Sequence, residues 1–230
     1  LWVCPGSDVS FDLSPYRLSA RLVASYILQL LGVAVSAVSG ALAAGRKHLD
    51  LLGVIVVGVV NAVGGGTLRD VLLDRHPVFW IERPTYLYVI LGATLLTVVY
   101  AKFFKPPYRA LLVADTFGLA LFSISGAQIA EQVELSYLLI VVMGTMTGTA
   151  GGLLRDVLLA DIPVIFTRSR IYATAAIVCI TAYLLLQEIG LLQTWAALIS
   201  MTVIVSLRLA AIIWGLMLPI FSLSDTPPHD

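Results

Sequence analysis

The chain has 230 residues, of which 59% are hydrophobic and only 12% are charged, and its 14 basic and 14 acidic residues balance. A soluble domain carries about 25% charged residues, and a nucleic-acid-binding domain carries an excess of Lys and Arg. The composition therefore excludes an ordinary soluble domain and gives no support for a nucleic-acid partner. Its polar residues gather between apolar runs of about 18–25 residues, the length of a membrane-spanning helix.

Seven apolar runs predict seven transmembrane helices. In chain order they cover residues 21–44, 49–73, 84–102, 109–130, 134–159, 170–188 and 192–218. Residues 1–20 are mixed and polar, which predicts an exposed tail or a short surface helix. The connectors are short and carry charged or turn-forming residues, so the chain is expected to form one structural domain.

A gapless internal repeat relates the first three runs to the next three. At an offset of 86 residues, Gly65 matches Gly151, Arg69 matches Arg155, and residues 69–73 and 155–159 have the same sequence, RDVLL. Because each half contains an odd number of spans, the second half must enter the membrane from the opposite face.

The predicted fold is thus an all-α polytopic membrane protein with an inverted 3+3 repeat and a seventh helix. The expected parts are a tail (1–20), the first repeat (21–104), the second repeat (105–190), the seventh helix (191–220) and a second tail (221–230). Proteins of this design bind or conduct their substrate near the midplane, between the repeats.

The distribution of Lys and Arg predicts the orientation, since cytoplasmic loops are enriched in both. Five lie on the side of the N-terminus: Arg17, Arg21, Arg69, Arg75 and Arg83. Eight lie on the other side: Arg46, Lys47, Lys102, Lys105, Arg109, Arg155, Arg168 and Arg170. We therefore expect a multi-pass protein of the cell inner (plasma) membrane, with its N-terminus outside and its C-terminus cytoplasmic.

Glycines near the ends of the second and fifth runs are the first candidates for a functional site. They are Gly64, Gly65, Gly66, Gly151 and Gly152. Each glycine inside a helix costs about 1 kcal/mol relative to alanine, so a duplicated run predicts a functional kink that interrupts the helix. The alternative is that the glycines only let neighbouring helices pack closely.

Polar residues within the runs are candidates for lining or gating a pore. Asn61, Thr67, Thr147 and Thr149 lie near the glycines of the second and fifth runs, and Ser39 and Ser125 lie on the first and fourth runs. Their oxygen atoms can replace the hydration water of a cation without binding it tightly, as conduction requires. Alternatively, helix-interior hydroxyls bond to their own backbone. The aromatic residues at the span ends (Trp80, Tyr86, Tyr88, Tyr172 and Trp195) are predicted to be interfacial anchors.

Charged residues at or within the spans are further candidates. Arg69-Asp70 and Arg155-Asp156 end the second and fifth runs on opposite faces, where they could guard two mouths of one pathway or cap the helix ends. Asp115 and Arg208 lie inside the fourth and seventh runs, and ionisable residues at such depth mark functional sites or structural pairs.

Neither an enzyme nor a cofactor is expected. The chain lacks the sequences H-E-x-x-H, G-x-S-x-G and GxxxxGK[ST], and its Cys and His residues lack the spacing of metal ligands. Asp70 and Asp156 are expected on opposite faces, too far apart for a catalytic pair.

The chain contains the duplicated elements GGG-x-x-RD and GG-x-x-RD, with S-G-A before each, and D-T-F-G-L-A-L-F from residue 115. In these motifs it resembles the bacterial TRIC family of trimeric intracellular cation channels. The resemblance covers about residues 21–220. It implies a homotrimer in membrane lipid, without an obligatory protein partner, and one potassium-permeable pore between the repeats of each protomer. Animal members have Lys-Glu-Val where this chain has three glycines, so their lipid-binding features are not transferred. Ala150 replaces the first glycine of the second run.

Two functions remain open from the residues themselves. The first is a monovalent cation channel that passes potassium or sodium along the two glycine-rich helices. The second is a secondary transporter of a small zwitterion such as glycine, in which Arg69 or Arg155 would hold the carboxylate. A structural scaffold would leave the duplicated charged element unexplained.

Overall fold

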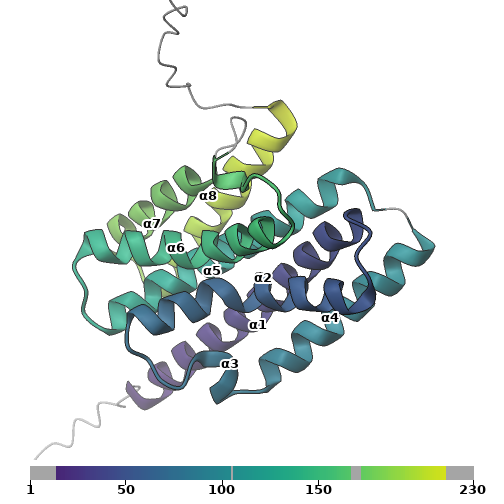
Figure 1. The fold of residues 1–230 in the computed structure, drawn as a ribbon. Helices are drawn as coiled ribbons and strands as arrows, with labels where there is room; N and C mark the ends of the chain where they lie inside the picture. Colours follow the sequence, from purple (N-terminus) through teal and green to yellow (C-terminus); the bar gives the residue numbers. More distant parts are fainter. Residues whose placement is uncertain (1–13, 105, 167–171, 216–230) are drawn as a thin grey trace, which may run out of the picture.

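The computed structural model describes residues 14–104, 106–166 and 172–215, and every regular element in these ranges is a helix (Figure 1). The elements are α1 (Ser14–Arg46), α2 (Leu51–Leu72), α3 (Phe79–Glu82), α4 (Thr85–Phe103), α5 (Tyr108–Gln132), α6 (Tyr137–Leu158), the 3-10 helix η1 (Val164–Phe166), α7 (Ala173–Glu188) and α8 (Gln193–Trp214). Six of these helices are long and apolar enough to cross a membrane, and α7 is a shorter apolar helix.

All seven predicted helices are present, with two differences. The first helix begins at Ser14, inside the predicted tail, and two short helices, α3 and η1, occupy predicted connectors. Residues 1–13 and 216–230, which hold most of both tails, lie outside the described residues. The same is true of Lys105, Arg168 and Arg170, which contributed to the predicted orientation.

Local signals mark several helix ends. The Asp50 carboxylate accepts a hydrogen bond from Gly53 N at 2.8 Å and thereby caps the first turn of α2. Pro107 directly precedes α5, where the missing N–H of proline costs nothing. Gly215 follows α8 with φ of 65°, the left-handed conformation that glycine adopts readily.

The two halves pack against each other as antiparallel pairs, α1 with α5 and α2 with α6. A Cβ atom added to Gly32 would meet the Phe122 ring at 3.3 Å, and one added to Gly118 would meet Ser36 Oγ at 2.6 Å. Each contact is the repeat equivalent of the other, because residues 32 and 118, and 36 and 122, are related by the offset of 86. This reciprocity is what an inverted repeat with a pseudo-two-fold axis requires.

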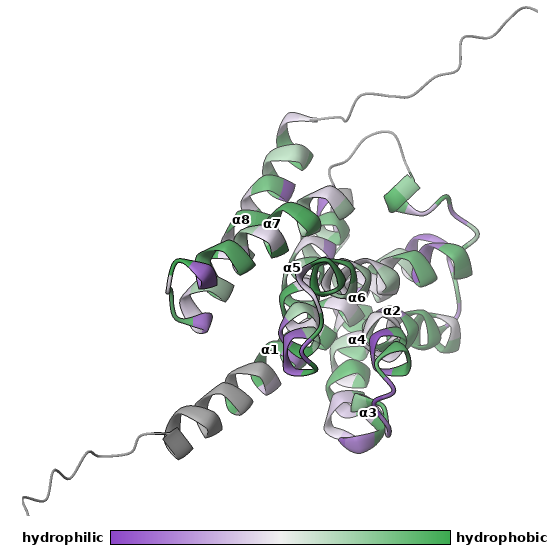
Figure 2. Ribbon diagram, turned by 90° about the vertical axis from the view of Figure 1, so that its left-hand side faces the viewer, coloured by the Kyte–Doolittle hydropathy of each residue, from purple (hydrophilic) through white to green (hydrophobic). Residues whose placement is uncertain are grey.

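The four paired helices form the centre, with α4 on one side and α7 and α8 on the other (Figure 1). Many large apolar side chains face outward, such as Leu96, which is 72% exposed, and Leu138, which is 73% exposed. Hydrophobic residues dominate the helices, whereas hydrophilic ones gather near helix ends and loops (Figure 2). Such an apolar surface fits a lipid environment.

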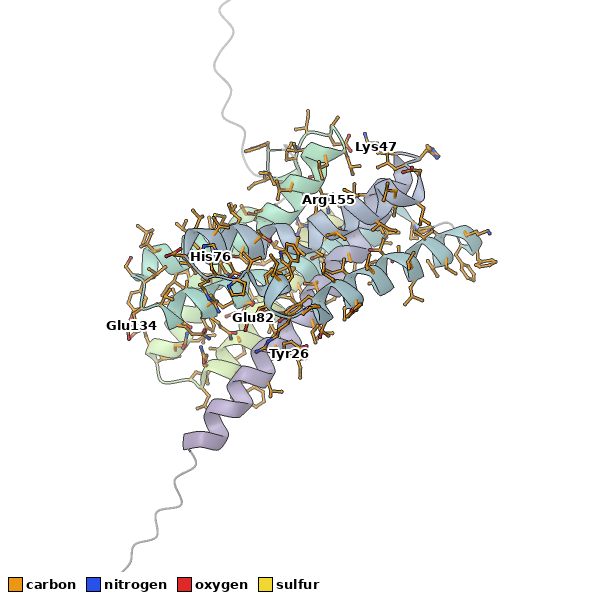
Figure 3. The ribbon with its side chains drawn as sticks, turned by 60° about the horizontal axis from the view of Figure 1, so that its bottom comes forward. Tyr26, Lys47, His76, Glu82, Glu134 and Arg155 are labelled. Atoms are coloured by element: carbon orange, nitrogen blue, oxygen red, sulfur yellow. The ribbon has the colours of Figure 1, made fainter. Side chains whose placement is uncertain are left out.

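Polar contacts tie the helices together at both ends of the bundle. At the end that we call the Arg155 end, Lys47 Nζ lies 2.6 Å from Asp161 Oδ1. At the opposite, Arg69 end, Glu131 accepts hydrogen bonds from Tyr183, Gln187 and Gln193. Figure 3 shows Tyr26, His76, Glu82 and Glu134 toward the Arg69 end and Lys47 toward the other, with Arg155 nearer Lys47.

Candidate functional site

Helices α2 and α6 cross at the duplicated glycines. A Cβ atom added to Gly65 would lie 2.0 Å from the Thr147 carbonyl oxygen, and one added to Gly151 would lie 2.3 Å from the Asn61 carbonyl oxygen. These two contacts are again repeat equivalents. Because the obstacle in each case is backbone rather than a flexible side chain, glycine is required for the helices to approach this closely.

The expected interruption of these helices is corrected by the structure. Both α2 and α6 are described throughout, and each continues as an α-helix through its glycines to Leu72 and Leu158. Tertiary packing outweighs the poor helix propensity of glycine here, since each residue gives up side-chain contacts but permits a backbone contact between helices. Close packing, the alternative interpretation, describes the glycines; a bend that opens on conduction stays a prediction.

Polar groups from both repeats line a small cavity at the crossing. Its walls include Ser36, Asn61, Asp115, Thr147 and Tyr172. Asn61 Nδ2 donates to the Ser36 carbonyl oxygen at 2.5 Å, and Thr147 Oγ1 donates to the Met143 carbonyl oxygen at 2.6 Å. The cavity measures about 10 Å³, room for about one water molecule. The space between the two repeats is therefore polar and tightly constricted.

A buried ion-pair network lies on the Arg155 side of this cavity. Arg155 Nη1 donates to Asp115 Oδ1 and to Ser39 Oγ, both at 2.8 Å. Arg208 Nη2 donates to the other Asp115 oxygen at 3.0 Å, and its guanidinium stacks 4.4 Å from the centre of the Tyr172 ring. The structure thus confirms the structural pairing of Asp115 and Arg208, one of the two interpretations of these residues, and joins both to the fifth-span arginine.

Each Arg-Asp pair also caps the short helix that follows it. Asp70 Oδ2 accepts from Phe79 N at 2.9 Å, and Asp156 Oδ2 accepts from Val164 N at 3.0 Å. The other carboxylate oxygen accepts from the Nε of the neighbouring arginine in both pairs, at 2.9 and 2.8 Å. The capping role is therefore visible in the geometry, whereas a role at the mouths of a pathway stays a prediction.

A larger cavity of about 200 Å³ opens at the Arg69 end, and we call it the Arg69 cavity. It is lined by Tyr26, Gln29, Arg69, Arg75, Phe79, Glu82, Arg83, Tyr86, Ile129 and Gln132. The Arg69 guanidinium carbon lies 5.7 Å from the centre of the Phe79 ring. Three arginines and one glutamate make the wall electropositive, in contrast to the balanced network at the other end.

The remaining predicted polar residues lie apart from the crossing or face their own backbone. Thr67 Oγ1 donates to the Val63 carbonyl oxygen at 2.8 Å and accepts from Trp80 Nε1 at 3.0 Å. Thr149 Oγ1 donates to the Thr145 carbonyl oxygen at 2.9 Å. Ser125 is buried, 1% exposed, and its hydroxyl makes no hydrogen bond in the described part of the chain.

Two predicted interfacial anchors are wrong, because their side chains are buried and line the two cavities described above. Tyr86 and Tyr172 are 2% and 4% exposed, packed beside Arg69 and Arg208 respectively, whereas Tyr88 and Trp195 are exposed. Their equivalence across the repeat was the signal for this role, because a lipid-facing anchor has no reason to be duplicated. Ser36 and Gln29 carried no comparable signal.

Comparison with known proteins places this geometry in a family. The model of the family described as "Glycine transporter" matches twice, over residues 26–102 and 112–188. The chain is 45% identical to the UPF0126 inner membrane protein YadS of Escherichia coli (strain K12) over 207 residues, 87% of this chain and 97% of that protein. A UPF0126 membrane protein of Vibrio cholerae is 40% identical over 86% of this chain and 83% of that protein.

Solved structures of similar proteins have the same fold as this chain. A TRIC trimeric intracellular cation channel orthologue from Rhodobacter sphaeroides superposes with a TM-score of 0.80 at 38% identity, covering 84% of this chain and 99% of that one. A structure described for conductance through TRIC cation channels gives a TM-score of 0.78 at 32% identity over 87% of this chain and 98% of that one.

Proposed function

The chain belongs to the TRIC family, matched by the "Glycine transporter" model in both halves, and from this premise we propose that it is a potassium-permeable channel for monovalent cations. The ion passes inside each protomer, between the two repeats. The transporter of a small zwitterion, left open by the residues, is not favoured, because the matched structures are those of cation channels.

The observation that carries the proposal is the polar cavity at the crossing of α2 and α6. Both repeats contribute to it, through Asn61 and Thr147, and amide and hydroxyl oxygens of this kind replace hydration water without holding a cation tightly. Carboxylates near the path are engaged by arginines, so no ring of unpaired acids selects divalent ions among the described residues.

Conduction requires the crossing to widen, because room for about one water molecule does not pass a hydrated cation. The glycines provide two surfaces without side chains, along which α2 and α6 can slide or separate. We infer that the opening motion is a shift of these helices against each other. Gating changes of packed helices commonly take this form of shear.

The assembly and membrane placement follow the relatives. The Rhodobacter sphaeroides protein is described as trimeric and the Escherichia coli relative as an inner membrane protein. We extend both to this chain: a homotrimer in the inner membrane, surrounded by lipid, with the N-terminus outside and the C-terminus cytoplasmic.

Single-channel recording of the purified protein in planar bilayers tests the function. With unequal potassium concentrations on the two sides, discrete openings should reverse near the potassium equilibrium potential. An Asn61→Leu variant, which removes the amide from the crossing, should lower the unitary current, whereas Tyr88→Leu on the exposed surface of α4 should not. Absence of discrete openings, together with saturable uptake of glycine, would establish a transporter instead.

A further inference from the structure

The two repeat-related arginines occupy equivalent places but have different partners. Each binds the aspartate that follows it in the chain. Arg155 additionally donates to Asp115 and Ser39. Arg69 is 1% exposed, and its Nη1 and Nη2 make no hydrogen bond in the described part of the chain; Nη2 lies 2.8 Å from Asp70 Oδ1, outside hydrogen-bonding geometry. Buried N–H donors that lack acceptors are costly, even where the guanidinium itself is paired with a carboxylate.

The difference originates in one substitution between the repeats. At the offset of 86, the position equivalent to Asp115 is Gln29, which has no negative charge. Its Oε1 accepts a hydrogen bond from Tyr86 OH at 3.2 Å. The Ser125 hydroxyl, the equivalent of the Ser39 hydroxyl that Arg155 binds, makes no hydrogen bond among the described residues. The first half thus keeps the arginine and its surroundings but lacks the anionic oxygens that Asp115 supplies in the second half.

The Arg69 cavity is bordered by Gln29 and Arg69, the repeat equivalents of Asp115 and Arg155. Its volume of about 200 Å³ exceeds the space of a few water molecules. Two more arginines, Arg75 and Arg83, stand on its wall against a single acid, Glu82. Arg83 is held over the Tyr26 ring at 5.1 Å. A fork of guanidinium donors in an electropositive cavity suits an oxyanion, above all phosphate.

We propose that the Arg69 cavity binds a phosphate group, whose oxygens take the place that the Asp115 carboxylate has in the other repeat. The Arg69 Nη atoms are the buried ligands, and Arg75 and Arg83 complete the neutralisation at the exposed rim. The phosphate comes either from solution on this side of the membrane or from the headgroup of an anionic lipid. A bound phosphate would lower the positive electrostatic potential at this end of the bundle. Its binding does not depend on whether the protein conducts ions.

Thermal unfolding of the purified, detergent-solubilised protein tests the proposal. Inorganic phosphate, compared with chloride at equal ionic strength, measures binding of the free ion, and phosphatidic acid, compared with phosphatidylcholine, measures binding of a lipid headgroup. The melting temperature of the wild-type protein should rise with one of the two probes. Gln29→Asp, which introduces the residue of the other repeat, should lose this rise because its own carboxylate occupies Arg69.

Two further variants keep the experiment decisive. Arg83→Gln should reduce the response even if Gln29→Asp does not fold. Arg109→Gln removes an exposed arginine at the opposite end and should keep the full response. A response to phosphate identifies the free ion, and a response to phosphatidic acid alone identifies lipid. If neither probe stabilises the wild-type protein, or if Gln29→Asp and Arg83→Gln respond as the wild type does, the proposal is overturned, whatever the channel recordings show.

Discussion

Three arginines are buried among the residues whose side chains the structure describes, each about 1% exposed, and their partners differ. Arg155 and Arg208 share the two oxygens of Asp115, and Arg155 also binds Asp156, so that two guanidinium groups face two carboxylates in the second half. Arg69 has the neighbouring Asp70 and the Phe79 ring. Since an ionic group in the membrane interior must be paired or hydrated, the unmatched Nη donors of Arg69 are the reason for placing the proposed phosphate there.

Asp115→Asn should strongly destabilise the protein. The change leaves two buried guanidinium groups without their shared carboxylate, and breaking a buried pair from one side costs about 3–5 kcal/mol. The matched control is Asp161→Asn, which breaks the exposed pair with Lys47 and should cost about 0–1 kcal/mol. Thermal unfolding in detergent measures both. Equal melting temperatures for the two variants would show that the Asp115 network does not hold the helices together.

The long helices could be predicted from the sequence, because the length of each apolar run and the gapless repeat can both be read directly from the order of residues. The two short helices could not be predicted: α3 and η1 have four and three residues, and each begins where a buried aspartate accepts its first amide. The low helix propensity of glycine also led to a wrong prediction, because it indicated an interruption where α2 and α6 continue as helices. The deciding interaction, backbone against backbone at Gly65 and Gly151, is tertiary and has no signature in one helix alone.

This contact changes what glycine substitutions should do. From the sequence, Gly65→Ala and Gly151→Ala would alter permeation more than folding. In the structure, each added methyl group would meet a carbonyl oxygen at 2.0 or 2.3 Å, so the helices must separate. We expect both variants to be destabilised by about 1–3 kcal/mol, the range for overpacking.

Gly92→Ala is the matched control, since nothing lies within 4 Å of an added Cβ atom there, and it should be neutral or stabilising. An added Cβ atom at Gly64 meets the flexible end of Leu154 at 2.7 Å and the Gly151 Cα at an ordinary contact distance of 3.6 Å, so Gly64→Ala should fold and suits measurements of permeation. Melting temperatures and elution profiles compare the series. Wild-type stability of Gly65→Ala would mean that the helices do not touch there.

At the scale of the whole molecule, the inverted repeat predicts two equivalent ends, and the structure makes them unequal. The Arg155 end is closed by the Asp115 network, to which α8 contributes Arg208 from outside the repeat. At the Arg69 end the described helices include no repeat-related counterpart of α8, and there the cavity of about 200 Å³ is found. Helix α8 and the difference between Gln29 and its equivalent Asp115 therefore both make the Arg155 end the more closed of the two. The two ends of the molecule are thus distinct across the membrane.

That direction can be measured by cysteine accessibility. The excess of Lys and Arg on the Arg155 side predicts that this end faces the cytoplasm. In a Cys4→Ser background, Ser136→Cys lies exposed at the Arg69 end and should react with a membrane-impermeant maleimide added to intact cells. Lys102→Cys, exposed at the end of α4 on the opposite side, should react only after the cells are permeabilised. Cys179 is buried and should stay silent in both. The reverse pattern would invert the orientation, and the Arg69 cavity would then take its phosphate group from the cytoplasmic side.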